Sequence, residues 1–204
     1  MASRQQCLDY WAGRLNGQEN GPDSYAAPSP RREAYVVSIF ERYVPDHQMR
    51  VIELGCNCGR NLLALQEAGY DRLSGVDCNA LAVAEAKRRF PQLNADLCVS
   101  TFEDFAPKLP EAAPEVIFTV AALEHLHWQR QDEVFDAMAR CARIIVTVED
   151  EVGYTWRHFP RNYAGIFVPR GMVQVFAERC PKVDNDIAFG FFARVFYAQG
   201  AADA

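Results

Sequence analysis

No apolar run in the 204-residue sequence is long enough to cross a bilayer as a helix, which takes about 20 residues. The first residues lack the basic-then-apolar pattern of a secretory signal peptide. The sequence also has no internal repeat and no low-complexity tract. We therefore expect a cytoplasmic protein that has no membrane partner.

Positive charge is scarce as well, because 21 Lys and Arg against 27 Asp and Glu give a formal net charge of −6. Nucleic acids and anionic membranes favour proteins with a basic face that neutralises phosphates. We therefore expect no nucleic-acid partner and a small-molecule substrate instead. The oligomeric state stays open.

A disulfide framework is also missing. The seven cysteines are an odd number and are spread through segments with the patterns of strands and helices, so we expect reduced thiols. Cys56 and Cys58 form a Cys-x-Cys pair that suggests a metal. A tetrahedral site needs four ligands, however, and no second Cys or His pair follows at a suitable spacing. We expect no metal site and interpret both cysteines as small residues that fill a loop.

The sequence does have the composition of one soluble domain, with 50% apolar and 24% charged residues. The continuous apolar runs "EVIFTV" and "RIIVTV" are typical of strands buried on both faces. Strands are predicted at 50–54, 73–77, 95–99, 115–120 and 143–148, and helices at 60–68, 80–89 and 130–142. This alternation predicts an α/β fold with a doubly wound, mainly parallel sheet and helices on both faces.

The segments outside this alternation are less regular. Helices are predicted at 7–15 and 31–44, with a flexible Gly-, Pro- and Ser-rich stretch between them. After an aromatic-rich connection we predict a helix over 171–180 and a strand in "DIAFGFFARVFYA", with a partner strand near 182–185. We divide the single domain into an N-terminal helical cap and flexible segment, 1–45, and a core, 46–204.

The stretch "VIELGCNCGRN", residues 51–61, is the first turn from strand to helix in this core. In open parallel sheets ligands bind beyond the carboxyl ends of the strands, and this turn is the usual cradle. A dinucleotide fingerprint that starts at Gly55 needs glycines at positions 57 and 60, where this chain has Asn57 and Arg60. An NAD-dependent oxidoreductase is therefore disfavoured.

Glu53, Gly55 and Gly59 instead match the pattern acidic-x-Gly-x-Gly-x-Gly, in which Asn57 is the one departure. Here the chain resembles the class I S-adenosylmethionine-dependent methyltransferases. The resemblance extends from about residue 50 to the end through "ELGCNCG", "LSGVD", "VSTFEDF" and "VIFTVAALEHL". It implies a Rossmann-like fold with seven strands, the last one antiparallel, and S-adenosylmethionine as the cofactor.

The resemblance also implies roles for individual residues. Asp77 ends a strand, where a carboxylate can accept both hydroxyls of a ribose. Gly55 and Asn57 would lie beside the methionine portion, with Glu53 orienting its ammonium group. A cap for the helix 80–89 is the alternative role of Asp77.

The adenine would lie beside Cys78 and Asn79. Phe102 and Glu103 would complete its pocket, Phe102 by packing and Glu103 through the exocyclic amine. The family often has Asp where this chain has Thr101, so the register of this turn is open by one residue.

In "LEHLHW", His125 comes just after the fourth strand, where a methyl acceptor would approach. A neutral imidazole there could take the acceptor's proton as a general base. Methyltransferases of very different substrate classes have a similar stretch, so packing beside the cofactor explains His125 at least as well. For His127 and Glu124 a structural or solvent-facing role is the default.

The connection after the fifth strand is rich in rings and cations. Its candidate acceptor contacts are Tyr154, Trp156, His158, Arg161 and Tyr163. They could form a lid that favours an acceptor with a carboxylate or phosphate, or the rings could simply cover the edge of the sheet.

Three acidic residues, Glu149, Asp150 and Glu151, precede that connection. They could bind a hydroxyl, an amine or a divalent ion, but an acidic solvated turn is the more common arrangement.

Methyl transfer requires mainly that acceptor, methyl and sulfur are aligned and that water is kept out. Our first hypothesis is therefore a methyltransferase acting on oxygen or nitrogen of a small-molecule or glycan-type acceptor. The second is a catalytically silent methyltransferase-fold protein that acts in protein interaction, for which the departure at Asn57 is the only hint.

Overall fold

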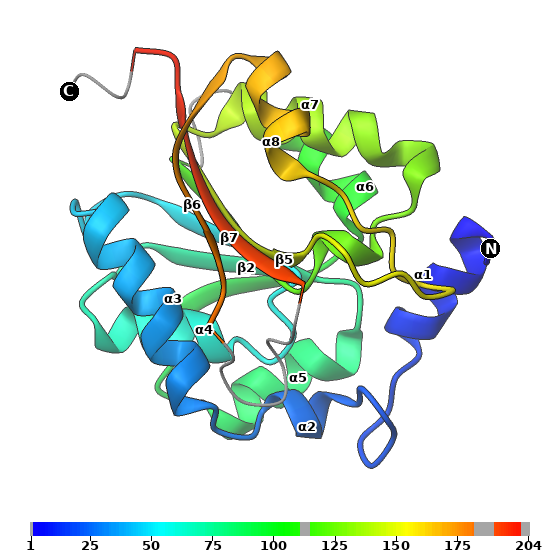
Figure 1. The fold of residues 1–204 in the computed structure, drawn as a ribbon. Coiled ribbons are helices and arrows are strands. Elements are labelled where there is room, and N and C mark those ends of the chain that lie inside the picture. The colour runs from blue at the N-terminus through cyan, green and yellow to red at the C-terminus, as the bar shows by residue number, and fades with distance from the viewer. Residues whose placement is uncertain (1, 111–114, 182–189, 201–204) are drawn as a thin grey trace.

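The computed structural model describes residues 2–110, 115–181 and 190–200, which form a seven-stranded sheet with helices on both faces (Figure 1). The strand order is β3-β2-β1-β4-β5-β7-β6. The parallel strands are β1 (Val51–Leu54), β2 (Leu73–Asp77), β3 (Ala95–Val99), β4 (Val116–Val120) and β5 (Ile144–Asp150). β7 (Phe191–Ala198) runs antiparallel to both β5 and β6 (Met172–Arg179). The predicted doubly wound sheet with an antiparallel last strand is confirmed.

Helices cover the sheet because the strands are apolar on both faces. The helices are α1 (Arg4–Ala12), α2 (Pro22–Tyr25), α3 (Pro30–Tyr43), α4 (Arg60–Glu67), α5 (Ala80–Arg89), α6 (Phe102–Phe105), α7 (Gln131–Cys141) and α8 (Tyr163–Phe167). One core cluster joins Phe40 of α3 and Leu65 of α4 to Phe118, and the other joins Phe135 of α7 and Phe167 of α8 to Ile117. Among the described residues, no helix combines the length and apolar character that a membrane crossing requires.

The segment 171–180 forms strand β6, so the prediction of a helix there was wrong. Met172 and Phe176 are four residues apart, a spacing that suits a helix, but they also lie on alternate positions of a strand. The β-branched Val173 and Val175 are exposed on the opposite face, and the backbone pairs with β7 at the edge of the sheet. The partner strand predicted near 182–185 falls outside the described residues.

The N-terminal helix begins at Arg4, three positions before the predicted start, because Ser3 caps it. The Ser3 hydroxyl accepts from the N–H of Gln6 at 3.3 Å, and the Gln6 side chain accepts from the N–H of Ser3 at 2.8 Å. The stretch that follows was predicted to be flexible, but it contains α2 and local hydrogen bonds. The N–H of Gly17 donates to Asp23 at 3.0 Å, and the N–H of Asp23 donates to Asn16 at 3.1 Å.

Asn79 holds α1 against the carboxyl end of the sheet. Its amide nitrogen donates to the carbonyls of Trp11 at 3.1 Å and Arg14 at 2.9 Å. Its amide oxygen accepts from the N–H groups of Leu81 and Ala82, which caps α5. One side chain therefore fixes both the start of α5 and the position of the first helix, which lies beyond the ends of the central strands (Figure 1).

Replacing Asn79 with Ala should lower the free energy of unfolding by about 1 to 2 kcal/mol, because α5 loses its cap and α1 loses its anchor. Urea unfolding followed by circular dichroism measures this change, and limited proteolysis should show faster cleavage in residues 1–20. Ser3→Ala is the matched control, since it removes a cap only from the outer end of α1 and should leave the cleavage pattern near that of the wild type. Equal stability of Asn79→Ala and the wild type would contradict the anchoring role.

Candidate functional site

The carboxyl ends of β1, β2 and β4 and helix α1 enclose a cavity of about 100 Å³. Eight of the residues predicted for the site line it, namely Gly55, Asn57, Asp77, Cys78, Asn79, Phe102, Glu103 and His125. Gly59 and Glu53 are not among the lining residues. The helix α1 contributes Cys7 and Trp11 to the wall.

The loop after β1 has left-handed backbone at three alternate positions. Gly55 has φ +80°, Asn57 has φ +46° and Gly59 has φ +74°. A Cβ on Gly55 would lie 2.5 Å from the Cβ of Ala122, so only glycine leaves the backbone this close to the β4 turn. Asn57 adopts the conformation that glycine would have there, as asparagine can. The departure from the family pattern therefore leaves the shape of the loop intact.

Asp77 ties this loop to the end of β2. One carboxylate oxygen accepts from the N–H of Asn57 at 2.9 Å and the other from the N–H of Asn79 at 2.8 Å. Burial raises the pKa of Asp77, and these amide hydrogen bonds oppose that rise. The cap of α5 is Asn79, so the alternative role of Asp77 as a helix cap was wrong. Its remaining lone pairs are available to hydroxyl groups in the cavity.

Glu53 is buried beneath the loop after β1, and only one of its two carboxylate oxygens accepts a hydrogen bond from a described residue. Its Oε1 accepts from the side-chain amide of Asn61 at 2.6 Å, while Oε2 has no hydrogen-bond partner among the described residues. Burial raises the pKa of Glu53 to about 8, and the hydrogen bond from Asn61 opposes this rise. A buried carboxylate with an unused oxygen fits a cationic ligand group, such as the ammonium of the methionine portion of S-adenosylmethionine.

The predicted adenine side is built around α6. The Phe102 ring lies 3.2 Å from the position of a Cβ on Gly55, and Thr101 caps the helix by accepting from the N–H of Asp104 at 3.2 Å. Glu103 is buried and pairs with Arg4 of α1 at 3.1 Å. This ion pair joins residues far apart in the chain, and no local sequence signal indicates it. Glu103 therefore also holds α1 over the cavity.

The two ring nitrogens of His125 face different partners. Nδ1 lies 3.4 Å from the carbonyl oxygen of Arg157, and Nε2 lies 3.6 Å from Oε1 of Glu124. The ring contacts Trp11, at 4.1 Å between centroids, and His158, at 4.7 Å, with the ring planes tilted by 40° and 54°. Burial lowers the pKa of His125 to about 3, so the imidazole is neutral at physiological pH and a weak base.

Two of the five predicted acceptor contacts, His158 and Trp156, lie on the side of α1 and His125. His158 packs beside His125, and the Trp156 ring makes an edge contact with Tyr10 of α1 at 5.3 Å. Tyr154 is exposed. Arg157, which the sequence analysis did not single out as a contact, places its guanidinium 4.7 Å from the Tyr10 ring centroid and 5.5 Å from that of Trp156.

The other two predicted contacts, Arg161 and Tyr163, do not reach the cavity. The guanidinium of Arg161 donates to the carbonyls of Leu123, Phe159 and Leu126 and so holds the turn that carries His125. Tyr163 is fully buried in the core beneath α7.

The acidic residues at the end of β5 are not a solvated turn, so that expectation was wrong. Glu149 is fully buried, and it accepts from the N–H groups of Ala122 at 3.0 Å and Glu124 at 3.1 Å. Glu151 pairs with Arg194 at 2.6 Å. Glu124 and His127 are also buried, so neither faces solvent.

All seven cysteines are free thiols in the structure. Cys56 and Cys58 are buried, and the Cys58 thiol lies 3.1 Å from the carbonyl oxygen of Pro22. Burial raises the pKa of Cys78 to about 12, so this thiol stays protonated beside the cavity.

Comparison with known proteins places this site in a family. The model of a methyltransferase domain matches residues 51–144. The mRNA cap guanine-N(7) methyltransferase of Schizosaccharomyces pombe is 24% identical over 106 residues, which are 50% of this chain and only 29% of that protein.

Solved methyltransferase structures share the fold. Phosphoethanolamine N-methyltransferase 2 of Haemonchus contortus, in complex with S-adenosyl-L-methionine, matches with a TM-score of 0.74 and 12% identity over 97% of this chain and 60% of that one. TehB of Haemophilus influenzae matches with a TM-score of 0.62 and 18% identity over 81% of this chain and 62% of that one.

The loop geometry predicts that the protein binds S-adenosylhomocysteine and does not bind NAD. Gly55→Ala should abolish binding, because its Cβ needs the space beside Ala122 and the φ of +80° is unfavourable for alanine. Asp77→Asn should weaken binding about tenfold or more, because a charged acceptor for the ribose is lost. Isothermal titration calorimetry measures both effects. Gly165→Ala is the control, since nothing lies within 4 Å of its added Cβ. Normal binding by Gly55→Ala would contradict the predicted cradle.

The affinity for S-adenosylhomocysteine should rise with pH between about 6 and 8, by up to about tenfold per pH unit. Because burial raises the pKa of Glu53 to about 8, its carboxyl is largely protonated below that pH and must lose the proton to bind an ammonium group. Calorimetry in buffers of different ionisation enthalpy should detect the released proton. Glu53→Gln should bind more weakly and without this pH dependence; a pH-dependent Glu53→Gln would assign the effect to another group.

Proposed function

Because the chain belongs to the class I S-adenosylmethionine-dependent methyltransferases, we propose that it transfers a methyl group to an oxygen or nitrogen of a small-molecule acceptor, a class that includes glycans. The observation that carries the proposal is the covered cavity. The ends of the strands form one wall of the cavity, and α1 forms the opposite wall. Hydrogen bonds from Asn79 and the Arg4–Glu103 ion pair keep α1 in this position. A covered site suits a small acceptor better than a polymer.

The cofactor supplies a methyl group on a positively charged sulfur, so the protein needs to bind, align and exclude water. Asp77 holds the ribose hydroxyls, and Glu53 attracts the ammonium group. Phe102 and Cys78 pack against the adenine. These residues lie at or after the ends of neighbouring strands, on the same cavity as the turn that carries His125.

The acceptor would enter between α1 and the connection after β5. Trp11 and His125 form one wall, and Trp156 and Arg157 lie at the outer end. Flat rings with a guanidinium among them suit an acceptor that has an aromatic or anionic part. His125 is a weak base, so we propose that its ring packs beside the acceptor rather than deprotonating it beforehand.

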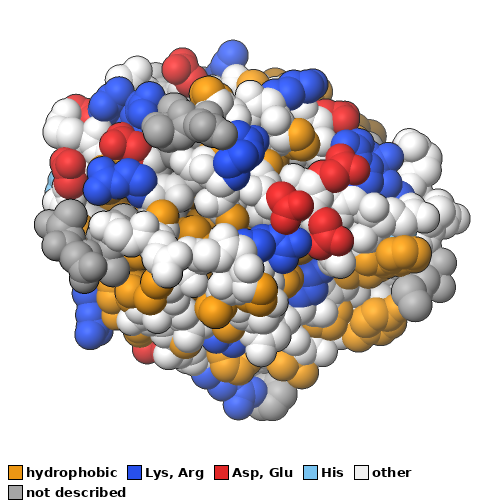
Figure 2. All heavy atoms as spheres, turned by 90° about the horizontal axis from the view of Figure 1, so that it is seen from above, with side chains coloured by type: hydrophobic (Ala, Val, Ile, Leu, Met, Phe, Trp, Pro, Cys, Tyr) orange, Lys and Arg blue, Asp and Glu red, His pale blue; other side chains and the backbone are white. Residues whose placement is uncertain are grey.

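The overall charge supports a small acceptor rather than a nucleic acid. The net charge is −6, and on the face drawn in Figure 2 basic and acidic side chains are interspersed instead of forming one basic surface. The relative from S. pombe is a cap methyltransferase, but the match spans only 29% of it. We therefore do not infer the acceptor of this chain from that relative.

The catalytically silent alternative loses its one supporting feature. The departure at Asn57 was the hint for it, and Asn57 has the left-handed backbone that the pattern requires. Catalysis on a small acceptor is the proposal that agrees better with an intact loop and a covered cavity.

Methyl transfer is tested by following S-adenosylhomocysteine formation with panels of small amines, phenols, hydroxy acids and sugars. We expect turnover with at least one class, and a preference for anionic members of it. Arg157→Ala should raise KM for such an acceptor by about tenfold with a smaller change in kcat, because a charged hydrogen bond outside the reacting atoms is lost. Arg31→Ala, a basic residue of α3 away from the cavity, is the control. Cofactor binding without turnover on any panel would favour the silent alternative.

A further inference from the structure

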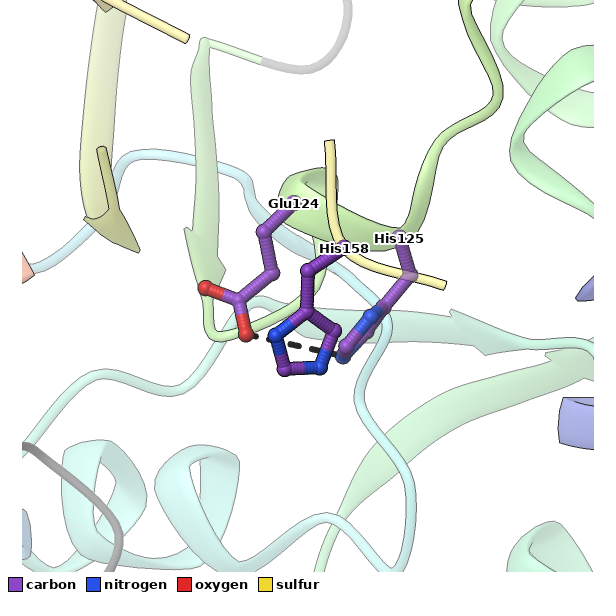
Figure 3. A group of neighbouring side chains, drawn as sticks. All are labelled: Glu124, His125 and His158. Carbon is purple, nitrogen blue, oxygen red and sulfur yellow. Dashed lines mark ion pairs between the residues drawn. The ribbon is translucent and has the colours of Figure 1, made fainter. Parts of the chain in front are cut away.

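Glu124, His125 and His158 bring three ligand atoms together at the acceptor end of the cavity. The carboxylate and the two imidazoles come from the turn after β4 and from the connection after β5, and they converge on one point (Figure 3). All three ligand atoms lie within 4.8 Å of one another. Catalytic zinc sites in proteins use three ligands of this kind, two His and one Glu, and leave one position open.

The hydrogen bond between His125 and Arg157 determines which ring nitrogen of His125 has a free lone pair. The carbonyl oxygen of Arg157 can only accept, so Nδ1 of His125 carries the hydrogen in their 3.4 Å contact. The other nitrogen, Nε2, then presents its lone pair to Oε1 of Glu124 at 3.6 Å. Two acceptors facing each other at this distance need a shared proton or a cation between them.

The supporting contacts are those that metal ligands usually have. A ligating histidine commonly donates its second ring N–H to a backbone carbonyl, as His125 does to Arg157. The second carboxylate oxygen of Glu124 accepts from the N–H of Asp150 at 2.8 Å, which holds Oε1 toward the histidines.

The distances suit a small divalent ion. With bonds of about 2.0 to 2.1 Å, tetrahedral zinc ligands lie about 3.4 Å apart. The Glu124–His125 pair, at 3.6 Å, is already close to this spacing, and the third ligand has to close by up to about 1.4 Å through rotation of the half-buried His158. Two imidazoles with a single carboxylate favour zinc over magnesium, which prefers oxygen ligands.

We propose that Glu124, His125 and His158 bind one Zn²⁺ ion, with the open position facing the acceptor. The ion would draw electron density from an acceptor oxygen and favour its deprotonated form, with the proton released to solvent. This catalytic role rests on the proposed function, whereas binding of the ion does not. The connection after β5 supplies His158, so the site was not visible in the spacing of the sequence.

The test is calorimetric titration of the full chain with Zn²⁺ after treatment with a chelator, and absorption spectroscopy with Co²⁺ as a substitute. We expect one ion per chain, and a visible Co²⁺ spectrum of a four- or five-coordinate site. His158→Ala and Glu124→Gln should each weaken zinc binding about 100-fold, because each removes one of three ligands. His47→Ala is the control, because His47 stacks on Tyr70 away from the trio and should leave binding unchanged.

Folding of each variant is checked by its binding of S-adenosylhomocysteine, which needs none of the three side chains as ligands. No zinc binding by the wild type would overturn the proposal. So would zinc binding that persists in both variants, since one of the free thiols would then hold the ion. Mg²⁺ bound in preference to Zn²⁺ would also overturn it. Zinc binding without S-adenosylhomocysteine binding would contradict the proposed function but not the metal site.

Discussion

The left-handed backbone of the loop after β1 is the constraint on which the site depends. Gly55, Asn57 and Gly59 turn the chain at the edge of the cavity, and the hydrogen bond that Asp77 accepts from the N–H of Asn57 holds that shape. The same carboxylate stands where the ribose is expected. One acidic side chain at the end of β2 thus builds the loop and presents the remaining lone pairs to a ligand, so the shape of the cradle and its chemistry cannot be changed independently.

A second set of contacts turns an open sheet edge into a covered site. Asn79 holds the end of α1, and Glu103 holds its start through Arg4. Asn79 follows β2 and Glu103 lies in α6, and both line the cavity, so the residues around the proposed cofactor site also position the helix that covers it. Trp11 from the cover then packs on His125, which connects the first helix to the turn after β4.

Much of this arrangement could be predicted where local pattern and tertiary environment agree. The parallel strands carry continuous apolar runs, and the glycine loop and Asp77 follow from their place at strand ends. Prediction failed where contacts with segments distant in the sequence determine the conformation or the burial of a residue. Strand β6 has a spacing that also suits a helix, and pairing with β7 settles its conformation. The burial of Glu149 and the contact between His125 and His158 depend on segments that meet only in the fold.

The position of α1 has a consequence for the order of events in turnover. Trp11 belongs to the same helix that covers the cofactor cavity, and it also forms a wall of the proposed acceptor site. The acceptor site is therefore complete only when that helix is in place, which favours an ordered sequence in which the cofactor enters first and its spent form leaves last. The release step would then depend on how fast α1 separates from Asn79 and Glu103, so contacts distant from the sulfur could govern the overall rate.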